Sequence, residues 1–280
     1  MSNYEVAGSL GLQGKIVAVV GGGGANNGIG RATAILFAKL GAKVAVLDIN
    51  SEAAAETARL INAVAENAAS VWQLDALNAD QVDKTLKEIL EKYKRIDVWV
   101  HIVGGHKGRT LIEEIPLDVW KLNIEINLTS AFIGSRAILP IMKRQRNGKI
   151  VLVSSFAVRS ISVSGADYAV AKAAIITFMK QLAYEGGFFN INVNAIVPGP
   201  THEPNPEKDR RDGRLPRVPL GRFARPEDQA KAIVFLASAW SEMITGVALD
   251  VDAGMQLGFV DWETYLSKHQ SPTNIREGNH

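Results

Sequence analysis

The sequence predicts an α/β fold in which helices cover both faces of a doubly wound parallel sheet. Apolar segments of strand length alternate along the chain with segments of helical periodicity. A glycine-rich turn, VVGGGGANNGIG at residues 19–30, separates the first apolar segment from the first helical one. The 280 residues contain no internal repeat, low-complexity tract or linker, so one domain is the simplest organisation.

The individual elements follow from these two patterns. Apolar runs predict strands at residues 15–20, 43–47, 70–74, 96–103, 149–154, 191–197 and 246–251. Helical periodicity predicts helices near residues 28–40, 51–66, 79–93, 118–146, 166–185 and 226–239. Ser51 is a candidate N-cap of the second helix, and Asn78 with Gln81 could form a capping box on the third. Gly41 and Gly148 stand where a glycine often follows a helix C-terminus.

Composition restricts the class of protein. Apolar residues make up 47% of the chain, and the net charge of +2 gives no reason to expect nucleic acid or a membrane surface as a partner. The absence of cysteine excludes disulfides and thiol catalysis. No apolar run approaches the roughly 18 residues of a membrane span, and the N-terminus lacks the pattern of a signal peptide. We therefore expect a cytoplasmic protein without nucleic-acid or membrane partners.

The glycine-rich turn is a candidate phosphate-binding site. At the first strand–helix junction of a doubly wound sheet, glycine backbone and a helix N-terminus can approach the pyrophosphate of a dinucleotide. The spacing Gly24-xxx-Gly28-x-Gly30 differs from the common G-x-G-x-x-G, and a merely flexible turn is the alternative. The strand–turn–helix context favours the phosphate site. The residues expected to contact the cofactor here are Gly24, Asn27, Gly28, Ile29 and Gly30.

Two acidic residues follow later strands and bear on the choice of cofactor. Asp48 ends the second strand, where a carboxylate can accept hydrogen bonds from the adenosine ribose and repel a 2′-phosphate. Residues 49–51 include no Lys or Arg, so NAD is expected rather than NADP, with Arg31 as the cation that could weaken this preference. Asp75, followed by Ala76, could meet the adenine amino group, although an ordinary turn Asp is nearly as plausible.

The chemistry is expected in the segment SSFAVRSISVSGADYAVAKAA. Tyr168 and Lys172 are spaced i, i+4 on one predicted helix face, and Ser155 ends the preceding strand. An ammonium about 4 Å from a phenol at an effective dielectric near 20 contributes about 4 kcal/mol, which would bring the phenol pKa of about 10 towards neutrality. Tyr168 is therefore a candidate general acid/base. For this short pair alone, an exposed tyrosine beside a solvated lysine is the preferred interpretation.

Taken together, the motifs resemble the short-chain dehydrogenase/reductase family from about residue 14 to 258. The glycine motif, Ser155, the Tyr168–Lys172 pair, INVNAIVPGP and GRFARPEDQAKAIVFLAS…ITGVALDVDAG occur in the order of that family. The resemblance implies a single-domain Rossmann fold with seven parallel strands, usually in a homotetramer. It also implies hydride transfer between a nicotinamide and the carbinol or carbonyl carbon of a small alcohol or ketone. No metal is expected, because no second His, Cys or carboxylate falls at ligand spacing around His101.

The resemblance also implies roles for individual residues. Tyr168 corresponds to the acid/base, and Lys172 to the residue that holds the ribose and acidifies the phenol. Ser155 would position the substrate oxygen, and Asn127, in EINLTSAF, would keep a water in the proton relay. Further cofactor contacts are implied at Val103, Gly104, Pro198, Gly199 and Thr201.

The chain departs from the family pattern in two places. Val20-Gly21 replaces the usual Thr-Gly, and about three residues are inserted before Gly28, so a longer phosphate loop is expected. The usual Asn-Asn-Ala-Gly reads HIVG, in which His101 could replace the first Asn as a structural or adenosine-contacting residue. His106 is expected at the mouth of the site, where it could touch nicotinamide or substrate. A surface histidine is an equal alternative.

Two further segments are a long loop within this core and an extension after it. Residues 200–219, PTHEPNPEKDRRDGRLPRVP, lie where the family places its substrate loop, and a structureless loop of this length is functional or disordered. Its basic residues could bind an anion, although a solvated surface of mixed charge is slightly favoured. Residues 259–280 form a C-terminal extension.

Other functions compete with an NAD-dependent alcohol dehydrogenase or ketone reductase. A 3-oxoacyl carrier-protein reductase is the nearest alternative, but it would normally use NADPH, which Asp48 disfavours. An enoyl reductase would separate its Tyr and Lys by six residues rather than three. A non-catalytic dinucleotide-binding protein is opposed by the combination of Asn127, Ser155, Tyr168 and Lys172.

Overall fold

The computed structural model describes residues 10–24, 28–106, 108, 110–160, 165–258 and 267. Its centre is one seven-stranded sheet in the order β3-β2-β1-β4-β5-β6-β7, with every pair parallel. This confirms the predicted fold class. The strands are β1 (Ile16–Val20), β2 (Lys43–Asp48), β3 (Ala69–Gln73), β4 (Val98–His101), β5 (Gly148–Val153), β6 (Ile191–Pro198) and β7 (Ala248–Val251).

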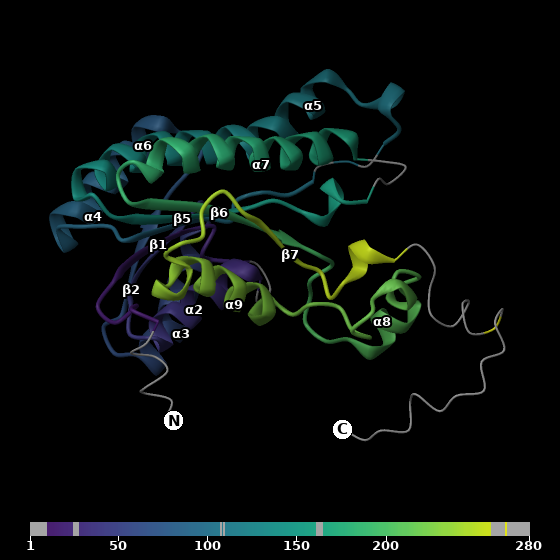
Figure 1. The fold of residues 1–280 in the computed structure, drawn as a ribbon, viewed down its shortest axis with the longest axis horizontal. Coiled ribbons are helices and arrows are strands. Elements are labelled where there is room, and N and C mark those ends of the chain that lie inside the picture. Colours follow the sequence, from purple (N-terminus) through teal and green to yellow (C-terminus); the bar gives the residue numbers. More distant parts are fainter. Residues whose placement is uncertain are drawn as a thin grey trace.

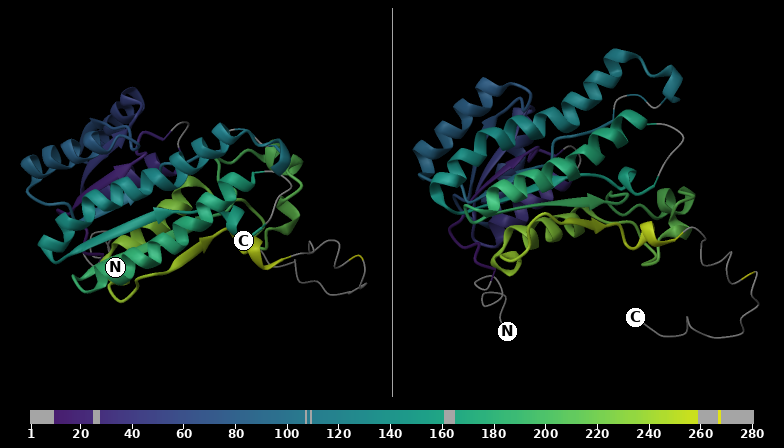
Figure 2. Two further views of the ribbon diagram at one scale, coloured as in Figure 1. Left: turned by 90° about the horizontal axis from the view of Figure 1, so that it is seen from above. Right: turned by 45° about the horizontal axis from the view of Figure 1, so that its top comes forward.

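Helices cover both faces of the sheet (Figure 1). One face carries α2 (Ile29–Lys39), α3 (Ser51–Val64) and α9 (Pro226–Ala237). The other carries α4 (Ala79–Tyr93), α5 (Leu117–Ile124), α6 (Ser130–Gln145) and α7 (Ala166–Gly187), and Figure 2 shows this layer from two further directions. The short helix α8 (Pro206–Arg211) lies beyond the carboxyl end of β7. None of the described helices has the length and apolarity to cross a membrane.

The strand order explains where the site forms. β1 pairs with β2 on one side, where Val20 faces Leu47, and with β4 on the other, where Val20 faces His101. The chain therefore winds outwards in opposite directions from β1, and a crevice opens between the loops at its carboxyl end. All five residues of β1 are buried, as expected for a central parallel strand between two helical layers.

Several predicted helix ends differ in the structure. Asn50, not Ser51, caps α3, because its side chain accepts a hydrogen bond from Ala53 N at 3.0 Å. Gly41 follows α2 with a φ of +86°, but Gly148 belongs to β5, and the left-handed residue after α6 is Arg146. The predictions for Ser51 and Gly148 were wrong because the Asn50 side chain caps α3, and the left-handed backbone of Arg146 ends α6 two residues before Gly148.

Two further elements differ from the prediction. Asn78 caps α4 by accepting from Gln81 N at 3.0 Å, but the Gln81 side chain accepts from Asp75 N, so the capping box is only half formed. The predicted helix at 118–146 is divided by a π-helical turn, η2 (Glu125–Thr129), between α5 and α6. The π-turn lies in the region that carries Asn127.

Candidate active site

The turn after β1 has the geometry of an anion site. Gly28 precedes α2 with no side-chain cap hydrogen bond, and the first turn of the helix contains no acidic residue, so no carboxylate of that turn competes with an anion for its N–H groups. A Cβ on Gly30 would lie 1.9 Å from the Gly21 carbonyl oxygen, so only glycine permits this approach of helix and strand. Asn27 lies outside the described residues.

A cavity of about 600 Å³ opens beside this turn. It brings together most of the predicted cofactor residues: Gly24, Ile29, Gly30, Asp48, Asp75, Ala76, Val103 and Gly104. Its remaining wall consists of residues that were not predicted to contact the cofactor: Val20, Gly21, Ile49, Leu74, Leu77, Ile102 and Ile126. Apolar walls with a few carboxylates and backbone groups suit a flat heterocycle joined to hydroxyls.

Asp48 ends β2 at the wall of this cavity. Its Oδ2 accepts from Gly23 N at 2.9 Å, and its Oδ1 accepts from Asn50 N at 3.0 Å. Arg31 Nε donates to Thr57 Oγ1 at 3.0 Å, which ties that guanidinium to α3. Asp75 also lines the cavity, while its Oδ1 accepts from Leu77 N at 2.9 Å as a turn residue does. Both interpretations of Asp75 are therefore compatible with the geometry.

Lys172 lies buried between α7 and the end of β5. Its side chain is on the same helix face as Tyr168, with Nζ 5.8 Å from the centroid of the phenol ring. Nζ donates to the Val153 carbonyl at 3.0 Å, and Ser154 Oγ donates to the Lys172 carbonyl at 2.8 Å. Burial lowers the pKa of Lys172 to about 8. The alternative of an exposed pair with a solvated lysine does not apply, because Lys172 is 3% exposed.

Ser155 lies two residues beyond the end of β5. Its backbone is extended, and its Oγ accepts from Ala157 N at 3.2 Å, which starts a short 3₁₀ turn over Phe156–Val158. The Ser154–Lys172 hydrogen bond places this strand end against α7. Ser155 and the Tyr168–Lys172 pair thus belong to adjoining elements at the carboxyl edge of the sheet.

Asn127 is fully buried within the π-helical turn. Its Nδ2 donates to the carbonyls of Gly105 at 2.7 Å and Asn123 at 2.9 Å, and its Oδ1 accepts from Gly105 N at 3.0 Å. A Cβ on Gly104 would lie 2.6 Å from Lys172 Nζ and 2.7 Å from Asn127 Oδ1. The polar ends of Lys172 and Asn127 therefore meet at Gly104, although the two residues are distant in the sequence.

His101 is a buried structural residue in this arrangement. Ser130 Oγ donates to the Ile126 carbonyl at 2.6 Å, so it accepts from His101 Nε2, 3.1 Å away. Burial, with the positive charge of Lys172, lowers the pKa of His101 to about 3, so the ring is neutral. His101 is not among the residues lining the cavity, which favours the structural alternative over adenosine contact.

The end of β6 holds three further predicted cofactor residues, none of which lines the cavity described above. Pro198 is the last residue of β6, and Gly199 packs so closely that a Cβ would lie 2.7 Å from Asp252 Cα. Thr201 Oγ1 donates to the Gly199 carbonyl at 2.9 Å and accepts from Gln229 Nε2 at 3.0 Å. The sequence analysis did not predict Gln229, because this residue of α9 is distant from Thr201 in the sequence and meets it only after folding.

His106 is held beside Tyr168 rather than on the surface. Its Nε2 lies 3.1 Å from Asp167 Oδ1, and its ring centroid lies 5.5 Å from that of Tyr168. Asn123 Nδ2 donates to the other oxygen of Asp167 at 2.5 Å. Asn123 and Asp167 were missed from the sequence, although their spacing from Asn127 and Tyr168 placed both next to predicted site residues.

The sequence predicted a structureless loop at residues 200–219, and this prediction was wrong. The segment contains α8 and a 3₁₀ turn at Leu215–Arg217. Arg211 pairs with Glu207 at 2.5 Å, and Arg214 pairs with Asp212 at 2.5 Å. These internal pairs favour the mixed-charge surface over an anion site. The side chains of Lys208 and Arg210 lie outside the described part of the chain.

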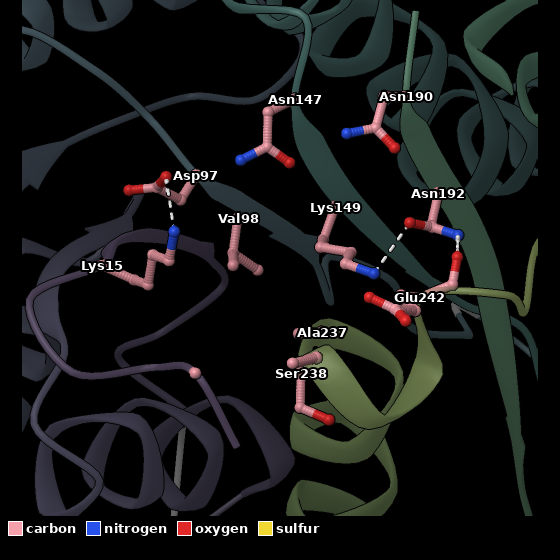
Figure 3. Close-up of a pocket in the computed structure, with 12 residues that line it drawn as sticks. Lys15, Asp97, Val98, Asn147, Lys149, Asn190, Asn192, Ala237, Ser238 and Glu242 are labelled. Atoms are coloured by element: carbon pink, nitrogen blue, oxygen red, sulfur yellow. Dashed lines mark hydrogen bonds and ion pairs between the residues drawn. The ribbon is translucent and has the colours of Figure 1, made fainter. Parts of the chain in front are cut away.

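A second cavity, of about 330 Å³, lies at the opposite, amino edge of the sheet (Figure 3). Both of its lysines contact other groups of the protein: Lys15 Nζ lies 3.7 Å from Asp97, and Lys149 Nζ donates to Asn192 Oδ1 at 2.7 Å. The predicted site residues lie at the other edge. Within the described ranges, no group of three or more His, Asp or Glu side chains is arranged to hold a metal ion.

Comparison with known proteins places this site in a family. The family described as "Enoyl-(Acyl carrier protein) reductase" matches residues 23–256. The 3-oxoacyl-[acyl-carrier-protein] reductase FabG of Thermotoga maritima is 36% identical over 248 residues, covering 87% of this chain and 98% of the relative. The cyclohexanol dehydrogenase of Rhodococcus sp. is 33% identical over 267 residues, covering 88% and 98%.

The fold comparison agrees. A crystal structure from Burkholderia xenovorans, assigned to the short-chain dehydrogenases/reductases, superposes with a TM-score of 0.82 at 30% identity, covering 89% of this chain and 99% of that one. The strand order and sequence similarity extend through the residues that form the cavity and the Tyr168–Lys172 pair. The chain belongs to the short-chain dehydrogenase/reductase family and is an oxidoreductase of that family.

Proposed function

We propose that this protein interconverts a secondary alcohol and a ketone with NAD as cofactor, using Tyr168 as the acid/base. The observation that carries the proposal is the burial of Lys172 beside Tyr168, with its Nζ close to Gly104, where the Asn127 amide oxygen also lies. A buried ammonium favours the phenolate form of a neighbouring tyrosine. Keeping a lysine 3% exposed is costly, which argues against a purely structural pair.

The residues around the large cavity fit a nicotinamide dinucleotide. The α2 N-terminus would hold the pyrophosphate, Asp48 the adenosine ribose, and Asp75 with Ala76 the adenine. Val103, Gly104, Pro198, Gly199 and Thr201 would surround the nicotinamide half. The bound cofactor supplies the hydride acceptor for alcohol oxidation. The lack of an acidic residue in the first turn of α2 and the absence of space for a Cβ at Gly30 support this assignment.

The protein's own groups would handle the substrate oxygen and its proton. Ser155 Oγ and the Tyr168 phenol would hold the oxygen, and Tyr168 as phenolate would accept the hydroxyl proton during oxidation. Lys172 stabilises the phenolate electrostatically. Asn127, fixed by both polar groups of Gly105, would keep the proton path open beside Lys172.

A 3-oxoacyl carrier-protein reductase is the second candidate, because 3-oxoacyl reductases such as the Thermotoga maritima protein are similar along nearly the whole chain. The similarity to a cyclohexanol dehydrogenase supports the first candidate. The carboxylate of Asp48 at the cavity wall favours NAD over NADP. The three-residue Tyr–Lys separation supports carbonyl rather than enoyl chemistry.

We also propose a homotetramer. Aromatic and apolar side chains stand exposed on the outer helices α6 and α7 and at the residue that follows α7: Phe132, Val170, Tyr184 and Phe188. Exposed apolar groups gathered on two helices are typical of an interface between subunits. Light scattering should give four times the 30.2 kDa of one chain, and a monomer mass would contradict the proposal.

Incubation with NAD and a panel of secondary alcohols tests the proposed activity. Growth of absorbance at the reduced-nicotinamide band is the expected result, with acetoacetyl thioesters and NADPH as the competing pair. Faster turnover of the thioester with NADPH would favour the reductase alternative. Cofactor binding without turnover of any alcohol, ketone or thioester would favour a non-catalytic protein.

A further inference from the structure

A buried carboxylate lies next to Tyr168 and is not needed for the proposed acid/base chemistry. Asp167 is 1% exposed, and three donors converge on it. Oδ1 accepts from Tyr168 N at 2.9 Å and lies 3.1 Å from His106 Nε2, while Oδ2 accepts from Asn123 Nδ2 at 2.5 Å. A carboxylate is buried only when such hydrogen bonds replace its water.

The three donors come from separate elements. Tyr168 N belongs to the first turn of α7, Asn123 to α5, and His106 to the segment that follows β4. Asn123 also accepts from Asn127 Nδ2 through its carbonyl oxygen at 2.9 Å. Asp167 therefore connects the acid/base, the Asn127 turn and His106 in one hydrogen-bonded cluster.

The cluster determines which nitrogen of His106 carries a proton. The Asp167 oxygen already accepts from Tyr168 N, and carboxylate oxygens act as acceptors, so His106 Nε2 is assigned as the donor. In the neutral ring Nδ1 is then the acceptor nitrogen. A Cβ on Gly165 would lie 2.9 Å from His106 Cε1, so the ring is packed against that backbone as well as beside Tyr168. The side chain is 11% exposed, which leaves part of the ring accessible.

We propose that Asp167 is a positioning residue that holds His106 as the Nε2–H tautomer, so that Nδ1 accepts a hydrogen bond from a second hydroxyl group of the substrate. This inference rests on the proposed function, which places the reacting oxygen at Tyr168. Because the imidazole neighbours the Tyr168 ring, the second hydroxyl would be close to the reacting carbon. The substrate class is therefore a diol, or the hydroxyketone formed from it.

A purely structural role for Asp167 makes a different prediction. An acidic residue in the first turn of a helix stabilises the helix dipole without any partner. Asp80 occupies the same second position in α4 but is exposed, so it supplies a matched control. Asp167→Asn keeps the shape of the side chain, but all three partners are donors, and its NH₂ group must face at least one of them.

The first test reads the tautomer of His106 directly. Enzyme labelled with ¹⁵N in its histidine rings is studied by long-range ¹H–¹⁵N NMR at pH 8, and His106→Phe identifies the resonance among five histidines. The expected result is a single Nε2–H tautomer in the wild type and in Asp80→Asn, which is lost in Asp167→Asn. An Nδ1–H tautomer in the wild type, or an unchanged spectrum in Asp167→Asn, would overturn the proposal.

The second test compares oxidation of cyclohexanol with that of trans-1,2-cyclohexanediol. One hydrogen bond to the second hydroxyl should favour the diol by about tenfold in kcat/KM. This preference should disappear in both His106→Phe and Asp167→Asn and persist in Asp80→Asn. Circular dichroism and thermal unfolding show whether each variant is folded. If Asp167→Asn does not fold, His106→Phe still tests whether the preference for the diol depends on the imidazole.

The outcomes separate this inference from the proposed function. Turnover of both alcohols without a preference for the diol, or a preference that Asp167→Asn retains, would overturn the inference and leave the proposed function intact. A wild-type enzyme inactive with both alcohols would contradict the proposed function and the diol assignment together. The NMR result would then decide the positioning role of Asp167 alone.

Discussion

Asn127 and Gly105 exchange two hydrogen bonds in opposite directions, at 3.0 Å to Asn127 Oδ1 and 2.7 Å from its Nδ2. The side-chain amide of Asn127 thus pairs with both the N–H and the C=O group of Gly105, as a residue of a neighbouring strand would. This pairing anchors the π-helical turn to the segment after β4. It also brings Asn127 Oδ1 against Gly104, next to Lys172 Nζ.

Gly104→Ala should reduce activity much more than Gly105→Ala. The new Cβ at 104 would lie within 3 Å of both Lys172 Nζ and Asn127 Oδ1, whereas a Cβ at 105 would meet no atom within 4 Å. We expect Gly104→Ala to lower kcat by at least about tenfold, because a displacement of about 1 Å in a catalytic group can be still more costly. Steady-state kinetics of both variants provide the measurement. Equal activity in the two would show that the space at Gly104 does not matter.

Tyr168→Phe should lower kcat by a factor of about 10² to 10⁴, the usual contribution of general acid–base catalysis, and preserve cofactor binding. Lys172→Ala should lower kcat and also weaken cofactor binding, since it is expected to hold the ribose. Tyr184→Phe is the control, because it removes only a hydroxyl and keeps the ring that we assign to the subunit interface on the same helix. The measurements are turnover and cofactor titration. Activity within a few-fold of the wild type in Tyr168→Phe would refute the assignment of the acid/base.

Asp48 should determine the preference for NAD over NADP. A carboxylate about 4 Å from a 2′-phosphate at an effective dielectric near 20 is repelled by about 4 kcal/mol, less with solvent screening. Asp48→Asn keeps an acceptor for Gly23 N but removes the charge, and it should raise kcat/KM for NADP at least about tenfold relative to NAD. Asp75→Asn is the matched control at the same cavity. Comparable kcat/KM values for both cofactors in the wild type would contradict this prediction.

His101 should make the fold sensitive to acid. Its pKa is about 3 in the folded protein, below its ordinary value of 6.5, so between these values the unfolded chain binds a proton that the folded one does not. The free energy of unfolding should therefore fall as the pH is lowered from 6.5 towards 3, by at most about 1.4 kcal/mol per pH unit from this group. Urea unfolding of the wild type and His101→Asn between pH 4.5 and 8 measures the difference. Parallel stability curves would exclude this contribution.

The segment 200–219 should close over bound substrate. Limited proteolysis should cut it more slowly in the ternary complex than in the free protein, and equal cleavage rates would argue against a lid that closes over the substrate.

Replacing Arg210 and Arg214 together by Ala tests whether this segment binds an anionic substrate, through the effect on KM, with Arg59→Ala on α3 as an exposed control. Because Arg214 already pairs with Asp212, we expect KM to change less than threefold. A larger rise would indicate contact with an anionic group.

Much of the fold could be predicted because its signals are local. Continuous apolar runs identified the strands, and helical periodicity identified the helices, since burial on one or two faces is written into consecutive residues. The i, i+4 spacing placed Tyr168 and Lys172 on one helix face, and the strand pattern placed Asp48 at the end of β2. Each of these predictions depends on spacing within a single element.

Contacts between elements could not be read in this way. The cluster of His106, Asn123 and Asp167 forms because α5, α7 and the segment after β4 meet at one edge of the sheet. Burial of Lys172 and the neutral state of His101 depend on the packing around them, which no neighbour in the sequence reveals. The π-turn at Asn127 likewise arises where that side chain bonds Gly105, because hydrogen bonds to a distant backbone can outweigh the local preference for a regular helix.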